Sequence, residues 1–282
     1  MKSLAVKMVS LLLTLTFFKE AYFVVQNYYE TAVFGSSAVQ VVEDNRSFEK
    51  FPDTFKGYIY KDSNYKLDMY FRIYLPAGYD KTKVYPVIVF LHGSGERGND
   101  NNKQLAGDWF DALAKSVKDG EGTNPCILVA PQCPPDHEWA DGSAKTQNMK
   151  SQVKDLIVKG IKKNYSVDTK RIYLTGFSMG GYGAWYITTK YPNMFAAAVP
   201  VAGGGQPGFA WLLKDVPIWA AHSLFDKSVN VINSIAMVEA LKGINGNIKY
   251  TQYNDIKYGH GDAAKLIYST PELFTWLFAQ SK

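Results

Sequence analysis

Residues 171–181 read Arg-Ile-Tyr-Leu-Thr-Gly-Phe-Ser-Met-Gly-Gly, and this stretch decides how the rest of the chain is interpreted. Its first five residues, Arg171–Thr175, are typical of a buried β-strand. A Gly-x-Ser-x-Gly pattern centred on Ser178 follows, and a helical period begins at Gly180. Glycines are expected on both flanks because a Cβ there would collide with the neighbouring strand or helix. The stretch predicts a sharp strand–turn–helix junction that exposes the Ser178 hydroxyl above the sheet edge, with a tight turn of no chemical role as the alternative.

Segments with strand and helix patterns alternate on both sides of this junction. Continuous or alternating apolar runs predict eight strands. These are Gly57–Lys61, Leu67–Tyr74, Tyr85–Leu91, Cys126–Ala130, Arg171–Thr175, Ala196–Val201, Pro217–Ala221 and Lys249–Tyr253. Apolar residues at three- and four-residue spacing predict five helices. These are Leu105–Val117, Met149–Lys163, Gly180–Tyr191, Val231–Leu241 and a single last helix, Ala263–Gln280.

This alternation of buried strands and helices predicts an α/β fold. We expect a mostly parallel, twisted sheet of about eight strands with helices on both faces. In such a sheet the functional side chains lie in the loops at the carboxyl ends of the strands. The loops after the predicted strands are therefore where chemistry is expected.

The composition fits such a domain and argues against several other classes. Of the 282 residues, 46% are hydrophobic and 20% are charged, so the chain can bury a core and is not mainly disordered. The formal net charge of +5 is small and scattered, and no nucleic-acid partner is expected. Two cysteines and four histidines leave little material for a zinc site, and no metal or cofactor is predicted. The spacing of Cys126 and Cys133 favours free thiols over a disulfide.

The first twenty residues have the composition of a secretory leader. Lys2 and Lys7 precede an uncharged run of eleven residues, Met8–Phe18, which is too short to span a bilayer. A small residue is missing three positions before the nearest cleavage site, so an N-terminal anchor or apolar helix stays an alternative. We predict a secreted or periplasmic protein without stable membrane insertion after leader removal. A cytoplasmic or N-terminally anchored protein is the alternative.

Four stretches near the predicted strand ends carry a family resemblance. They are Leu91–Gly98 (Leu-His-Gly-Ser-Gly-Glu-Arg-Gly), Ala130–Pro134 (Ala-Pro-Gln-Cys-Pro), the Ser178 turn, and Pro271–Leu273 with the following Trp276-Leu277. In these stretches the chain resembles the α/β-hydrolase superfamily over about residues 57 to 280. It is most similar to compact feruloyl and acetyl carbohydrate esterases and to prolyl-oligopeptidase-related predicted peptidases. We divide the chain into a signal peptide or N-terminal anchor (1–20), an N-terminal extension (21–55) and an α/β-hydrolase catalytic domain (56–282).

The turn at Ser178 and the loop after Tyr85–Leu91 are predicted to bind the negative charge of tetrahedral acyl transfer. Two preorganised N–H donors can stabilise such an oxyanion by roughly 3 kcal/mol each. The N–H of Met179, directly after the nucleophile, is one predicted donor. The family resemblance implies Ser94 as the other.

The residues around Ser94 also have a simpler interpretation. Gly93 and Gly95 would only shape a turn if the loop had no chemical role. For Glu96 and Arg97 we prefer this interpretation and predict a local ion pair.

A serine hydroxyl needs a neighbouring base, and the chain order in this fold is Ser, then Asp or Glu, then His. Only His222 and His260 follow Ser178. A histidine at the place of His222, the end of a strand, is usually structural in the resembling family. His260 lies between the last strand and the last helix and is the predicted base. Asp226, after the seventh strand, is predicted to orient it, with a helix N-cap as the alternative.

The surroundings of this site are predicted less directly. The connection Ala202–Val216 is too short for a lid domain, so we expect an open groove with Pro134–Ala144 as one wall. Trp139 and Trp211 are candidates for stacking on a sugar or phenolic ring, with a core or rim position as the alternative. Many resembling proteins carry a tryptophan shortly after the histidine, where this chain has Gly261–Ala263.

These features predict a serine carboxylesterase, a hydrolase of class EC 3.1.1.-, that uses a Ser178–His260–Asp226 triad through an acyl-enzyme. Its substrates are expected to be small-molecule or polysaccharide-linked esters, carrying feruloyl or acetyl groups on carbohydrate. The alternatives are a prolyl-oligopeptidase-like peptidase or amidase and a polyester depolymerase. A hydrolase-fold binding protein without activity is a further alternative, although no triad member is missing.

Overall fold

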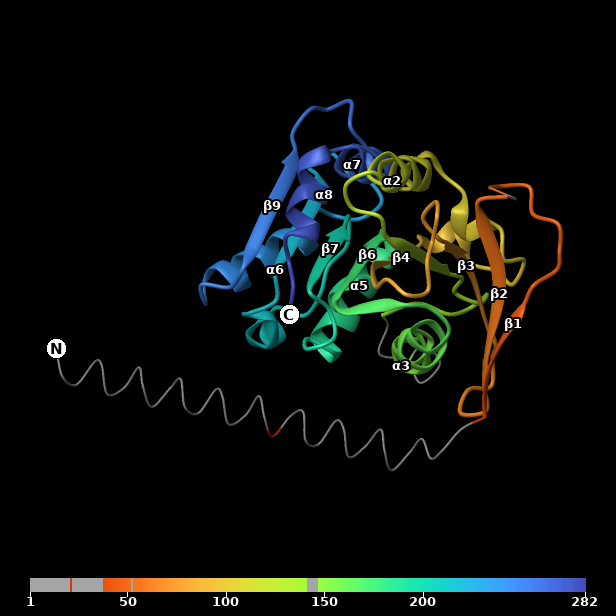
Figure 1. Cartoon of the computed structure of the whole chain (residues 1–282). Coiled ribbons are helices and arrows are strands. Elements are labelled where there is room, and N and C mark those ends of the chain that lie inside the picture. Colours follow the sequence, from red (N-terminus) through yellow and green to blue (C-terminus); the bar gives the residue numbers. More distant parts are fainter. Residues whose placement is uncertain (1–20, 22–37, 52, 141–146) are drawn as a thin grey trace.

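The computed structural model describes residues 21, 38–51, 53–140 and 147–282, and Figure 1 shows the chain. The predicted leader, residues 1–20, lies outside the described residues. One nine-stranded sheet has the order β1-β2-β3-β5-β4-β6-β7-β8-β9. Its strands are β1 Val39–Glu43, β2 Phe55–Asp62, β3 Met69–Tyr74, β4 Tyr85–Leu91, β5 Ile127–Pro131, β6 Val167–Phe177, β7 Ala197–Val201, β8 Ile218–Ser223 and β9 Ile248–Tyr253.

The sheet has an antiparallel edge and a parallel body. Strands β1, β2 and β3 pair antiparallel with one another, and β3 pairs antiparallel with β5. From β5 to β9 every neighbouring pair is parallel. The loops that follow β4, β6, β8 and β9 therefore leave from the same edge of the sheet. The predicted mostly parallel α/β fold is confirmed.

Alternate residues of the central strands pack on opposite faces of the sheet. In the fully buried strand β4, Val87, Val89 and Leu91 belong to one core cluster. Ile88 and Phe90 belong to the cluster on the other face. This two-sided burial explains why β4 is a continuous apolar run rather than an alternating one.

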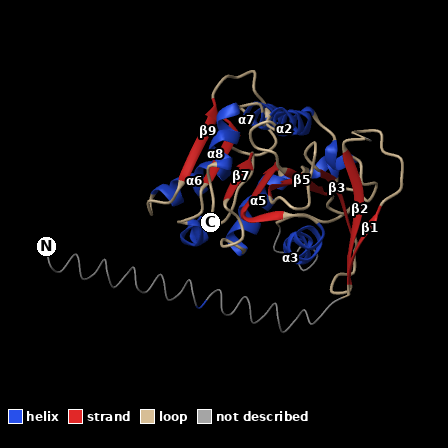
Figure 2. Cartoon of the chain, in the orientation of Figure 1, coloured by secondary structure: helices blue, strands red, loops and turns tan. Residues whose placement is uncertain are grey.

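Helices cover both faces of the sheet, as Figure 2 shows. One face carries α2 Asp108–Asp119, α7 His260–Tyr268 and α8 Pro271–Phe278, and the other carries α3 Gln147–Asp155, α5 Met179–Lys190 and α6 Ile232–Lys242. Short helical turns complete the set. They are η1 Ser94–Glu96, η2 Lys103–Leu105, the π-helical η3 Leu156–Ile161, α4 Lys162–Asn164 and η4 Pro207–Leu213.

Two parts of the fold differ from the prediction. The single last helix predicted over Ala263–Gln280 is wrong, because the structure has two helices, α7 and α8. Pro271 lacks an N–H and begins the new helix at its first position, where that N–H is not needed. The strand β1 was not predicted. It is a mostly exposed edge strand within the 21–55 segment, and it pairs with β2.

Three further findings concern the chemistry available in the fold. Cys126 and Cys133 are free thiols, as predicted, and burial raises the pKa of each to about 12. Within the ranges described above, no helix is long and apolar enough to cross a membrane. In the same ranges, no cluster of three or more His, Cys, Asp or Glu side chains is arranged to hold a metal ion.

Candidate active site

Ser178 stands at the predicted sharp turn between β6 and α5. Its backbone has φ 57° and ψ −117°, a left-handed conformation that costs of order 1–3 kcal/mol for a residue other than glycine. The Ser178 N–H donates to the carbonyl of Val201 at 3.0 Å, and its own carbonyl accepts from the Tyr182 N–H at 3.0 Å. These contacts fix the strained residue at the carboxyl edge of the sheet.

Three glycines of the turn are required by close backbone packing. A Cβ on Gly180 would overlap the carbonyl oxygen of Leu91 in β4. A Cβ on Gly181 would overlap the carbonyl of Val201, and one on Gly176 would overlap the carbonyl of Gly180. Backbone atoms cannot yield as side-chain ends can, so the predicted collision with neighbouring strand and helix is confirmed.

Ser178, His260 and Asp226 form one chain of hydrogen bonds. His260 Nε2 lies 2.8 Å from Ser178 Oγ, and His260 Nδ1 lies 2.6 Å from Asp226 Oδ2. A carboxylate can only accept, so Nδ1 carries the hydrogen and Nε2 is free to accept the Ser178 proton. The three predicted residues, which follow the strands β6, β8 and β9, therefore meet in the order Ser–His–Asp.

The Asp226 carboxylate is held in its charged form. Burial alone would raise its pKa, but hydrogen bonds outweigh this and hold the pKa well below its ordinary value. His222 and His260 donate to Oδ2, and the N–H groups of Ser228 and Val229 donate to Oδ1 at 2.8 and 2.9 Å. Asp226 precedes α6 by several residues and does not cap it, because the N-cap position belongs to Val231.

The imidazole of His260, the first residue of α7, packs against the ring of Phe177. Phe177 lies against it with ring centroids 4.7 Å apart, and Trp109 of α2 lies 4.7 Å from Phe177. A Cβ on Gly261 would be 3.1 Å from the Trp109 ring, so this indole fills the space beside the residue that follows His260. The Asp262 carboxylate accepts from the Gly259 N–H at 2.7 Å and caps the helix.

The loop after β4 lies directly against Ser178. A Cβ on Gly93 would be 3.5 Å from the Cβ of Ser178. Buried His92 fixes this loop, since its Nε2 accepts from the Cys133 N–H at 2.9 Å and its Nδ1 donates to the Gly93 carbonyl at 2.6 Å. Burial lowers the pKa of His92 to about 4, which keeps the ring neutral. Ser94 follows at the start of the short turn η1.

Glu96 and Arg97 do not interact as predicted. Arg97 pairs with Glu138 at 3.0 Å and donates to the His137 carbonyl at 2.5 Å. The Glu96 side chain instead folds back over Gly93, and its buried Oε2 has no hydrogen-bond partner among the described groups. Burial raises the pKa of Glu96, and the N–H groups of Gly93 and Glu96 and the charge of His260 offset part of this rise. The local ion pair is therefore replaced by a carboxyl at the edge of the site.

The two predicted aromatic contacts lie in different environments. Trp139 is 0% exposed, its Nε1–H donates to the His92 carbonyl at 3.0 Å, and its ring packs edge-on to His92. A fully buried ring cannot stack on a substrate, so the prediction for Trp139 is wrong and its core alternative holds. Trp211 is half-buried in η4, which is the one helical turn between β7 and β8.

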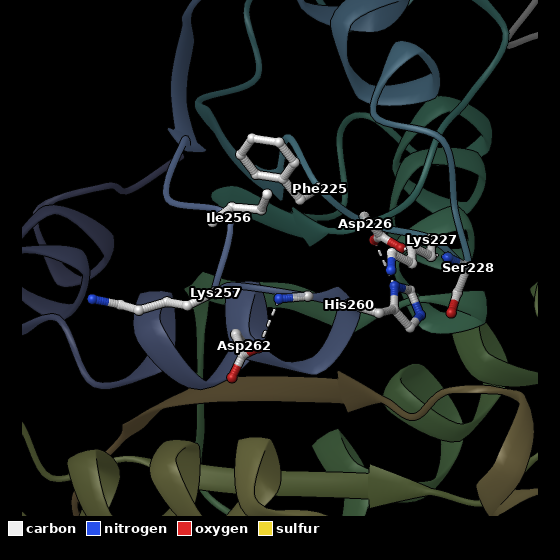
Figure 3. Close-up of a pocket in the computed structure, with 9 residues that line it drawn as sticks. Phe225, Asp226, Lys227, Ser228, Ile256, Lys257, His260 and Asp262 are labelled. Carbon is white, nitrogen blue, oxygen red and sulfur yellow. Dashed lines mark hydrogen bonds and ion pairs between the residues drawn. The ribbon is translucent and has the colours of Figure 1, made fainter.

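A pocket of about 620 Å³ opens beside His260 and Asp226, and Figure 3 shows it. Phe225 and Ile256 supply an apolar wall, and the Ile256 side chain is 78% exposed. Lys227, Ser228 and Lys257 supply polar groups around it. This pocket, which is lined by Asp226 and His260 but not by Ser178, thus combines a small apolar surface with hydrogen-bonding groups.

His222 makes a contact that the sequence pattern did not predict. A structural role was expected for it, and its buried ring lies with Nε2 3.1 Å from Asp226 Oδ2. The available signal was the spacing, because His222 is the second-to-last residue of β8 and Asp226 follows four residues later, in the turn after the strand.

Comparisons with known proteins show which family and fold this chain is similar to. A family model for esterases matches residues 63–241. A bifunctional acetylxylan esterase/xylanase of Neocallimastix patriciarum is 32% identical over 146 residues, which cover 51% of this chain and 20% of that protein. A poly(3-hydroxyalkanoate) depolymerase C of Paucimonas lemoignei is 42% identical over 129 residues, which cover 42% of this chain and 28% of that protein. The crystal structure of a thermostable esterase superposes with a TM-score of 0.75 at 34% identity, covering 82% of this chain and 64% of that one.

The chain thus matches less than a third of the length of these two curated relatives. The family match, in contrast, covers more than half of this chain and contains Ser94, the Ser178 turn and Asp226. This match shows that the chain belongs to the esterase family, and the mostly parallel sheet and the strained turn at Ser178 are consistent with it.

Proposed function

We propose that the protein is a serine carboxylesterase that hydrolyses esters through an acyl-enzyme. The observation that carries the proposal is the hydrogen-bonded chain from Ser178 Oγ through His260 to Asp226, with distances of 2.8 and 2.6 Å. His260 takes the Ser178 proton as the hydroxyl attacks the ester carbonyl, and Asp226 stabilises the imidazolium that forms. His260 then protonates the leaving alcohol, and a water molecule activated in the same way releases the acid.

Met179 and Ser94 are the proposed donors to the oxyanion. The N–H of Met179 begins α5, where the helix dipole also favours negative charge. The Ser94 N–H begins η1, in the loop that packs on Ser178. Both donors are backbone groups held by packing, so they require no reorganisation during the reaction.

We further propose esters carried by carbohydrate, with acetyl or feruloyl groups, as the substrate class. The acetylxylan esterase similarity supports this choice, and the short β7–β8 connection, which holds only η4, leaves room for a polymer. Half-buried Trp211 in η4 stays the candidate for stacking on a sugar or phenolic ring. A leader in residues 1–20 would export the enzyme to such substrates.

A polyester depolymerase is the second candidate. The 42% identity to a polyhydroxyalkanoate depolymerase favours it, and the exposed Ile256 beside Phe225 offers an apolar surface to a polyester chain.

A substrate panel tests these proposals. The enzyme is assayed on acetylated xylan, methyl ferulate, a polyhydroxyalkanoate film, a short p-nitrophenyl ester and a peptide anilide. We expect turnover of the p-nitrophenyl ester and of acetylated xylan or methyl ferulate, and none of the anilide. Preferential hydrolysis of the film would support the polyester candidate, and that of the anilide a peptidase.

The variant Ser178→Ala tests the nucleophile. We expect kcat to fall by about 10⁴-fold or more with the fold unchanged by circular dichroism. Ser281→Ala, at an exposed position near the C-terminus, is the matched control and should keep full activity. Equal activity of the two variants would refute the proposed mechanism.

A further inference from the structure

A second histidine contacts the acid of the proposed triad. His222 is fully buried at the end of β8, and its Nε2 lies 3.1 Å from Asp226 Oδ2 and 3.0 Å from the Val229 carbonyl. The same Asp226 oxygen accepts from His260 Nδ1 at 2.6 Å. One carboxylate oxygen therefore lies between two imidazoles, and only one of them reaches Ser178.

The other side of the His222 ring is also occupied. Nδ1 lies 2.8 Å from Ser234 Oγ in α6, and Ser234 Oγ lies 2.8 Å from the Gly203 carbonyl. His222 and Ser234 are both 0% exposed, so this part of the hydrogen-bonded chain is closed to bulk solvent.

The donors and acceptors around His222 fix where the hydrogens of this chain lie. The Gly203 carbonyl can only accept, so the single Ser234 hydroxyl hydrogen points to it. Ser234 Oγ can then only accept from His222, which requires a hydrogen on Nδ1. The carbonyl of Val229 and the carboxylate of Asp226 are also acceptors, which requires a hydrogen on Nε2.

We propose that His222 is a positioning residue that is protonated on both ring nitrogens and shares Asp226 with His260. This inference rests on the proposed triad. The His222 imidazolium neutralises part of the Asp226 charge and anchors the carboxylate to α6 and to the end of β7. Asp226 thereby keeps the orientation that His260 needs, while attracting the His260 proton less strongly than an isolated carboxylate would.

Other charged and titratable groups near Asp226 and His260 act equally in all variants. They are Glu96 in the loop after β4, Tyr182 in α5, Asp262 in α7, and Lys227 and Lys257 around the pocket.

Nitrogen-15 NMR of the histidine side chains tests the protonation state without any assay of activity. The chain has four histidines, which makes assignment practical. We expect both His222 nitrogens to be protonated at neutral pH, whereas buried His92 should show a single N–H and serves as the internal control. A single protonated nitrogen on His222 would overturn the proposal. The NMR result does not depend on whether the protein hydrolyses esters. Failure of the proposed protonation of His222 and failure of the proposed esterase activity can therefore be told apart.

The variants His222→Gln and His222→Leu separate geometry from charge. Glutamine can place a neutral N–H near the Nε2 position, whereas leucine removes both donors. Against p-nitrophenyl acetate we expect His222→Leu to lower kcat by about 10- to 100-fold at similar KM, the range for losing a hydrogen bond to a charged group. His222→Gln should recover most of kcat.

The pH profile of kcat/KM gives the readout that a purely structural role would not change. When the positive charge of His222 is lost, the Asp226 carboxylate is no longer partly neutralised. It then stabilises the protonated form of His260 more strongly. The acid limb of the profile should therefore move to higher pH in His222→Gln, even though kcat is largely recovered. An acid limb in His222→Gln that coincides with that of the wild type would overturn the proposal.

Discussion

The serine turn, residues 176–181, and the proposed oxyanion loop, residues 92–98, lie side by side at the carboxyl edge of the sheet, and their glycines have different surroundings. In the serine turn, added Cβ atoms would overlap backbone carbonyls of β4, α5 and β7. In the oxyanion loop, a Cβ on Gly95 would meet nothing within 4 Å, and one on Gly93 would first meet the end of the Glu96 side chain at 2.9 Å.

This difference separates glycines held by backbone packing from glycines whose neighbours are side-chain ends or open space. Collision with backbone cannot be relieved without moving strands, whereas a side-chain end can swing away. The serine turn should therefore tolerate no added atom, and the oxyanion loop should tolerate them at a cost to its fine geometry. The variants below challenge this comparison from the largest expected effect to the smallest.

Gly180→Ala should have the largest effect, on stability. The new Cβ would overlap the Leu91 carbonyl oxygen, and forcing β4 and α5 apart should cost about 3 kcal/mol or more. Chemical denaturation and the yield of folded protein measure this. A variant with wild-type stability would show that the turn yields and would remove the basis of the comparison.

Gly93→Ala should affect activity more than stability. Its Cβ would press on Glu96 Oε2 at 2.9 Å and contact the Ser178 Cβ at 3.5 Å, which displaces the loop that carries the Ser94 N–H. We expect kcat on a p-nitrophenyl ester to fall by about 10-fold, a fraction of the effect of losing an oxyanion donor. Adding Glu96→Ala should restore part of the loss. If the double variant is as inactive as Gly93→Ala, the added Cβ acts through its contact with Ser178 and not through Glu96.

Glu96→Gln should change the pH dependence of stability. Burial raises the Glu96 pKa above its ordinary value of 4.5, so the folded protein holds this proton more tightly than the unfolded chain does. The free energy of unfolding of the wild type should therefore fall as the pH rises from about 4.5 through the folded-state pKa. The Glu96→Gln variant has no titrating group at this position, so its free energy of unfolding should not show this fall. The melting temperature of Glu96→Gln minus that of the wild type should therefore increase with pH over that interval.

Glu239→Gln, at an exposed position of α6, controls for the loss of one carboxylate. It should show no such pH-dependent gain. A wild type whose stability advantage over Glu96→Gln grows with pH would contradict the raised pKa of this carboxyl.

Gly95→Ala should have the smallest effect. With nothing within 4 Å of the new Cβ and no left-handed backbone at this position, stability should stay within about 0.5 kcal/mol of the wild type. Thermal unfolding and the p-nitrophenyl ester assay measure this together. A large loss of activity at unchanged stability would show that Gly95 lies close to the bound substrate and is not needed for folding.

Much of the fold follows from local patterns in the chain. The central strand Tyr85–Leu91 has the same bounds in the prediction and in the structure, because its continuous apolar run records burial on both faces. The other buried strands were predicted within one to four residues of their bounds. The edge strand β1 escaped prediction because its residues are mostly exposed. The break before Pro271 was missed because the apolar period continues across it.

The candidate site was predicted in part. Chain order and strand ends singled out Ser178, Asp226 and His260, and the structure joins them by hydrogen bonds, while their catalytic roles stay predictions. Trp139 was misplaced because an indole suits a core as well as a sugar surface, and only packing separates the two.

By itself the amino-acid sequence determined the alternation of strands and helices, the glycine-lined turn at Ser178 and the loops in which an acid and a base follow it. These features are local, since burial on one or two faces and the steric needs of a turn leave their pattern within about ten residues. Only the tertiary structure decided that His222 shares Asp226 with His260, that the Glu96 side chain lies over Gly93 while Arg97 pairs with Glu138, and that Trp139 is buried in the core. Such contacts join loops far apart in the chain, and their geometry depends on how the whole sheet edge packs, which no local pattern records.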